Sequence, residues 1–200
     1  MRLSTRTLFL AALATVLATA CSDKTEEPIP ADPDSTLRMG SYFDFTTITP
    51  AGGTAHSGFG TTHSSLDIKG SAAMDTHLLV LDFSAGTDAV HFEIDRTKLT
   101  ASLLGAYALR SSARPTEPVF TSYVYRRNGG SSIYRFSDFT QNLTGDVTIT
   151  AYDAKRQLAS GHYEVRAPEQ RDPTSIGINN DPTCTILLAG DFENLKVKTQ

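Results

Sequence analysis

Residues 145–153 read GDVTITAYD, and residues 160–167 read SGHYEVRA. Apolar and polar side chains alternate in both stretches; in the first, Val147 and Ile149 share one face and threonines occupy the other. A period of two residues is that of a β-strand with one buried face. Burial on one side favours an antiparallel sheet. The two stretches therefore predict a hairpin over residues 146–166.

The strand pattern continues upstream of this hairpin. Residues 89–95 (AVHFEID) alternate in the same way. Residues 77–83 (HLLVLDF) are more evenly apolar, which predicts a central strand covered on both sides. The Asn128-Gly129 pair tolerates the positive φ angles of a tight turn, so residues 119–136 are expected to form a second hairpin.

The remaining predicted strands and loops are also consistent with an all-β fold. Further strands are expected at residues 40–48, 65–71, 105–111 and 184–198, and only residues 96–104 have a helical composition. About 8–10 short strands without alternating helices predict an all-β fold, either an antiparallel β-sandwich or an open barrel. Residues 50–64 and 167–183 are expected to be long loops. Loops on a rigid β framework often carry function, so either is a candidate site.

The N-terminal residues 1–20 are typical of a signal peptide. Arg2 and Arg6 precede an apolar stretch at residues 8–17, which is too short to span a bilayer. Small residues then lead directly to Cys21, a pattern that resembles the lipobox of bacterial lipoproteins. The resemblance implies that Cys21 becomes the N-terminus and carries acyl chains such as palmitate, which anchor the protein to a membrane. An ordinary cleaved signal peptide is the alternative.

Residues 21–36 are expected to form the lipidated cysteine and a flexible tether, because acidic residues and prolines dominate this segment. The length of residues 37–200 suits a single β domain. Without Arg2 and Arg6, 16 basic residues face 22 acidic ones, so the mature chain has a net charge of −6. This charge argues against nucleic acid as a partner.

Several motifs follow one another along the β domain. They are LDIKGSAAMDTHLLVLDF (66–83), GAYAL (105–109), an aromatic hairpin around Tyr123 and Tyr134, GDVTITAYDAKRQLASGHYEV (145–165) and ILLAGDFENLKV (186–197). This order resembles a family of small, β-rich lipoproteins of Bacteroidota, over roughly residues 40–198. That family has no assigned activity, so the resemblance implies an all-β lipoprotein and no catalytic residues. Ser22 directly after Cys21 also resembles the pattern of outer-membrane lipoproteins.

Few residues outside Cys21 suggest chemistry. With Cys21 lipidated, Cys184 has no disulfide partner, and its place at the start of CTILL favours a small buried hydrophobe over a nucleophile. His56 and His63 lie in one Gly-rich segment and are weak candidates for a metal site with Asp67, since zinc binds imidazole and carboxylate. Solvated histidines are the alternative, and no metal or cofactor is expected.

Carboxylates and tyrosines provide the other candidates. Glu93 and Asp95 share a strand face and could form a glycosidase-like pair, with a solvated face as the alternative. Tyr123 and Tyr125 lie on one face of the aromatic hairpin, and Tyr134 lies in its partner strand. Exposed, these tyrosines would bind a sugar or a protein partner; buried, they would be core.

These features favour a lipid-anchored envelope lipoprotein with a non-enzymatic, ligand- or partner-binding β domain. The alternative is an accessory glycan-binding lipoprotein of a polysaccharide-uptake system. The expected location is the outer membrane, on either its periplasmic or its cell-surface face, and the expected partners are the membrane and a protein or glycan ligand. A hydrolase would require a cleft that gathers histidines and carboxylates.

Overall fold

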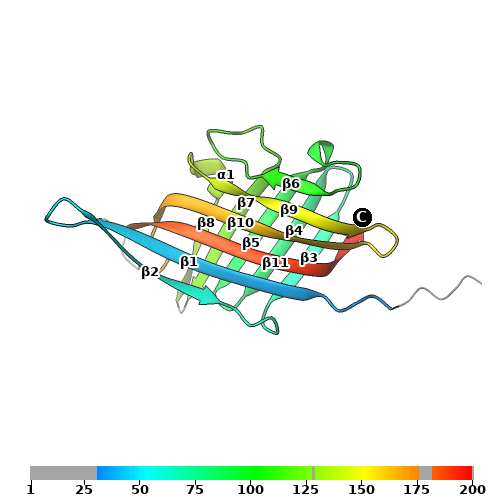
Figure 1. The fold of residues 1–200 in the computed structure, drawn as a ribbon, viewed down its shortest axis with the longest axis horizontal. Coiled ribbons are helices and arrows are strands. Elements are labelled where there is room, and N and C mark those ends of the chain that lie inside the picture. The colour runs from blue at the N-terminus through cyan, green and yellow to red at the C-terminus, as the bar shows by residue number, and fades with distance from the viewer. Residues whose placement is uncertain (1–30, 128, 176–181, 200) are drawn as a thin grey trace, which may run out of the picture. The chain divides into compact units, whose positions relative to one another are not determined.

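The computed structural model describes residues 31–127, 129–175 and 182–199, and it confirms the all-β fold class. Cys21 and the expected signal peptide lie outside the described residues. The strands are β1 (Thr36–Ile48), β2 (Thr54–Thr62), β3 (Lys69–Met74), β4 (Leu78–Ala85), β5 (Asp88–Asp95), β6 (Gly105–Ala108), β7 (Val119–Arg127), β8 (Gly130–Tyr134), β9 (Thr144–Asp153), β10 (Leu158–Arg171) and β11 (Thr183–Thr199) (Figure 1). Among the described residues, no helix is long and apolar enough to cross a membrane.

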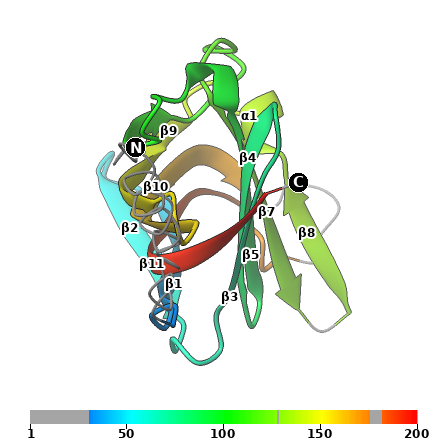
Figure 2. The same ribbon diagram turned by 90° about the vertical axis from the view of Figure 1, so that its right-hand side faces the viewer.

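The strands form two layers, which we name sheet A and sheet B. Sheet A has the order β6-β9-β10-β11-β1-β2, and sheet B has the order β3-β4-β5-β7-β8. The long strand β11 connects them, because it pairs antiparallel with β1 and β10 and then, through Val197–Thr199, parallel with β3. Figure 2 shows the two layers facing each other as a β-sandwich. The β11–β3 pair departs from the purely antiparallel sheet that the sequence favoured.

The core lies between the two sheets. Every second residue of β5 is buried, and β10 and β11 show the same alternation over most of their length. Aromatic rings from both sheets meet in the middle: the ring of Phe83 is 5.2 Å from that of Tyr163 and 5.5 Å from that of Phe192. Phe192 is fully buried at this contact.

Both predicted hairpins are present. Strands β9 and β10 pair as expected for residues 146–166, and β7 and β8 pair as expected for residues 119–136. Gly161 lies inside β10, where the register with β9 shifts between Ser160 and Gly161. A Cβ atom at Gly161 would lie 2.0 Å from the carbonyl oxygen of Thr148, so only glycine fits this close approach.

Other expectations were wrong in part. The segment 50–64 is not a loop, because β2 occupies most of it and pairs with β1 along its whole length. Strand β4 is buried on one face, with Leu79 and Leu81 inside and Val80 partly exposed, and is not covered on both sides. The loop expected at 167–183 is shorter, since β10 extends to Arg171.

The short helices also differ from expectation. Of residues 96–104, only Arg96–Lys98 form a single 3-10 turn, η1. The one described α-helical turn, α1 (Phe136–Phe139), follows β8, where no helix was expected.

Candidate functional site

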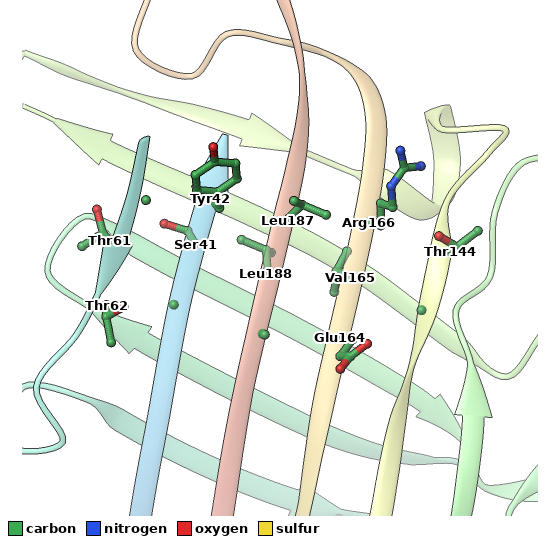
Figure 3. A pocket seen from close by; sticks show the side chains of 14 residues that line it. Ser41, Tyr42, Thr61, Thr62, Thr144, Glu164, Val165, Arg166, Leu187 and Leu188 are labelled. Carbon is green, nitrogen blue, oxygen red and sulfur yellow. The ribbon is translucent and has the colours of Figure 1, made fainter. Parts of the chain in front are cut away.

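The outer face of sheet A carries a hollow of about 670 Å³. Its position follows from the register of three neighbouring strands, in which Tyr42, Leu187 and Arg166 lie side by side. The next outward row lies two residues further along each strand, and it contains Gly40 and Ala189. Because these two residues have little or no side chain, the surface sinks between the bulkier groups. Figure 3 shows the row of Tyr42, Leu187 and Arg166 along one side of the hollow.

The ring of Tyr42 is held in place by the glycines of β2. A Cβ atom at Gly58 would lie 2.5 Å from the Tyr42 hydroxyl oxygen, and one at Gly60 would lie 2.9 Å from the ring carbon Cδ2. Both distances are shorter than a van der Waals contact, so the ring needs glycine at each position. The ring thus rests on β2 and still keeps 42% of its surface exposed. An exposed, fixed aromatic ring is a suitable platform for an apolar ligand face.

Two unpaired charges border the same hollow. Glu164 and Arg166 alternate on β10 and both face outward. Neither side chain forms an ion pair or a hydrogen bond with another described residue, and both are exposed. Thr62 and Thr144 add hydroxyl groups at the two ends of the hollow. The hollow therefore combines an aromatic ring, one acid, one base and hydroxyls that are free to bind a ligand.

A second, more polar hollow of about 470 Å³ follows along the same strands. Arg38, Asp191 and His162 form the next row of the register and border it. The outer face of sheet A is therefore hollowed at two successive places.

The tyrosines expected from the sequence do not line either hollow. Tyr123 is fully buried and donates a hydrogen bond to Asp88, and Tyr134 is 9% exposed and donates to the carbonyl oxygen of Arg171 at 2.8 Å. Tyr125 is partly buried, with its ring 5.3 Å from that of Phe43. Their inward direction supports the buried alternative, in which they belong to the core, because β7 turns this side toward the core.

The two candidate metal-site histidines bind different carboxylates. His56 Nδ1 lies 3.3 Å from Asp44 at the exposed β1–β2 hairpin, whereas His63 Nε2 lies 2.7 Å from the buried carboxylate of Asp88. Asp67 is exposed and contacts neither in any described interaction. Among the described residues, no group of three or more His, Cys, Asp or Glu side chains is placed to hold a metal ion.

The other chemical candidates have structural partners. Glu93 accepts from His91 Nε2 at 3.1 Å, while Asp95 caps the η1 turn by accepting from the backbone of Thr97. Cys184 is 3% exposed, and burial, helped by the negative charges of Asp172 and Asp44, raises its pKa to about 12. A thiol with such a pKa stays protonated at neutral pH and is a poor nucleophile.

Sequence reasoning missed Tyr42, although a signal for its direction was present. In residues 37–43 (LRMGSYF), Leu37, Met39 and Phe43 share the inward face, so Tyr42 must point outward. Its neighbours Leu187 and Arg166 are far along the chain, and only the strand register brings them together.

Comparisons with known proteins add little to this site. No protein-family model matches the chain, and no curated protein matches it. Among solved structures, a match is found to the membrane-proximal domain of mouse lysosome-associated membrane protein 1, with 9% identity and a TM-score of 0.27. The match covers 83% of this chain and 88% of that chain. A TM-score this low does not establish a shared fold.

Proposed function

We propose that the protein is a non-enzymatic binding domain of a bacterial envelope, anchored by lipid on Cys21 at the outer membrane. The signal peptide, the lipobox-like residues before Cys21 and the acidic tether support the anchor. The hollow on the outer face of sheet A, with Tyr42 on β1 and the unpaired Glu164 and Arg166 two strands away on β10, is the observation that carries the binding role.

The chemistry of the hollow favours a saccharide as the ligand. A sugar ring has an apolar face that packs on an aromatic ring, and its hydroxyls donate to a carboxylate and accept from a guanidinium. Tyr42, Glu164 and Arg166 offer these three contacts from two strands of one sheet. The glycan-binding role in a polysaccharide-uptake system is therefore the more specific form of the proposal.

Binding of oligosaccharides to the purified full chain in detergent tests this role. Glycan-array screening followed by titration calorimetry should identify a ligand whose binding is lost in Tyr42→Ala. Phe139→Ala is the matched control, because Phe139 is an exposed aromatic residue outside the hollow. If no glycan binds, or if both variants lose binding equally, the saccharide proposal is wrong.

The anchor has a separate test. Cys21→Ser should move the protein from the membrane fraction to the soluble fraction, because an acylated cysteine is required for stable attachment. An unchanged distribution between the fractions would contradict lipid anchoring.

A further inference from the structure

Strand β2 is an unprotected edge of sheet A. It pairs with β1 through nine consecutive residues without a shift in register, and no described strand pairs with its other side. Eight of its nine residues are exposed. An edge of this length presents unpaired backbone N–H and C=O groups to any other extended strand.

The features that normally protect such an edge are missing from β2. The strand reads TAHSGFGTT and contains no lysine, no carboxylate and no proline, and its pairing shows no bulge. The edge strand of sheet B, β8, differs from β2 in its contacts. Ser132 of β8 donates to the carbonyl oxygen of Pro173 at 3.4 Å, and Tyr134 donates to that of Arg171 at 2.8 Å. The side chains of β8 therefore contact the backbone of residues 171 and 173, whereas no hydrogen bond, ion pair or ring contact of β2 with a described residue reaches beyond β1.

We propose that β2 pairs antiparallel with β2 of a second copy of this chain, around a two-fold axis at Gly58. A two-fold contact uses the same surface on both copies, so the strand must be compatible with itself. β2 has no formally charged side chain, and its His56 lies next to Asp44 of the same copy. Two copies therefore meet at β2 without repulsion between like charges.

The register around Gly58 pairs the full length of β2 and places Ser57 opposite Phe59 of the second copy. Phe59 is 41% exposed, although its ring already stacks 6.3 Å from that of Phe45. Pairing covers part of this apolar surface as well as the free backbone. Copies anchored to one membrane also meet at a high local concentration, a contribution that rests on the proposed anchor.

The pairing joins the two outer faces into one continuous sheet. Gly60, Thr61 and Thr62 of β2 line the hollow, so the hollows of the two copies lie on either side of the shared strands. This consequence rests on the proposed binding role, whereas the dimer itself does not.

Disulfide trapping tests the register in the full chain in its membrane. Opposed residues of antiparallel strands have Cα atoms about 4.5–5.5 Å apart, which a disulfide can span. The double variant Ser57→Cys, Phe59→Cys should therefore form a covalent dimer on oxidation. The matched control is Ser131→Cys, Ile133→Cys on β8, which should stay monomeric; the native Cys184 is buried and does not interfere.

A charge at the edge provides the second measurement. Ser57→Lys should halve the molar mass measured by light scattering for the full chain in detergent, while Ser131→Lys should leave it unchanged. A monomeric wild-type chain at high concentration, or no cross-link between positions 57 and 59, overturns the proposal. A complex with a different protein at β2 overturns it too. Saccharide binding measured on the Ser57→Lys monomer tests the hollow of one copy without the dimer. The binding proposal and the dimer proposal can therefore be contradicted independently.

Discussion

His63 Nε2 and Asp88 Oδ2 lie 2.7 Å apart and connect the end of β2 to the start of β5 in the other sheet. Asp88 is fully buried and also accepts hydrogen bonds from Thr87 and Tyr123. A buried carboxylate is stable only when such donors replace its hydration. The contact thus holds the β1–β2 hairpin, and with it the hollow, against sheet B.

Replacing Asp88 should therefore be costly. We expect Asp88→Ala to lower the free energy of unfolding by about 3–5 kcal/mol, because it leaves buried donors without their acceptor. The exposed Asp191 is the control, and Asp191→Ala should change the stability by less than about 0.5 kcal/mol. Urea unfolding followed by circular dichroism measures both. Equal effects of the two variants would show that Asp88 has no special structural role.

Two buried tyrosine hydroxyls should respond in opposite ways. Tyr123 donates to Asp88, so Tyr123→Phe should cost about 1.5–3 kcal/mol, the usual range for a hydrogen bond to a charged group. The hydroxyl of Tyr163 has no hydrogen-bond partner among the described residues. Tyr163→Phe should therefore be neutral or stabilise the fold by up to about 1 kcal/mol. Thermal unfolding of the two single variants compares them, and a loss in Tyr163→Phe as large as in Tyr123→Phe would contradict this prediction.

His91 should make the stability depend on pH. Burial alone lowers the pKa of His91, but hydrogen bonds to Asp82 (2.7 Å) and Glu93 (3.1 Å), together with their charges, outweigh it and raise the pKa above 6.5. The folded state therefore holds the proton more tightly than the unfolded state. This contribution is complete below the ordinary histidine pKa and is lost as pH rises through the raised value.

The matching measurement is the unfolding of His91→Gln against wild type at pH 5.5 and pH 8.5. The variant should be less stable by up to about 1 kcal/mol at the lower pH, because solvent screens this partly exposed group. The difference should shrink at the higher pH. A difference that grows with pH would mean that the neutral imidazole is the favoured form.

The fold was predictable because it depends on local alternation, whereas the site depends on register. The hairpins around Asn128-Gly129 and within residues 146–166 were correct, since turn chemistry and period-two patterns are local signals. β2 was missed because its Gly- and Thr-rich sequence has no apolar alternation and becomes a strand only through pairing with β1. The row of Tyr42, Leu187 and Arg166 requires knowledge of which distant strands are neighbours.

The free charges of the hollow give the sharpest test of ligand binding. Arg166 has no partner among the described residues, so it breaks no existing hydrogen bond when it binds a ligand oxygen. The new charge-assisted hydrogen bond should therefore contribute about 1.5–3 kcal/mol to binding. Arg166→Gln should then weaken the affinity for a bound saccharide by about 10- to 100-fold. Arg126→Gln is the control. Arg126 is an exposed arginine on the outer face of sheet B, so this substitution removes the same charge away from the hollow. Titration calorimetry of both variants separates a specific contact from general electrostatics: equal weakening would mean that the net charge of the domain, and not the hollow, controls binding.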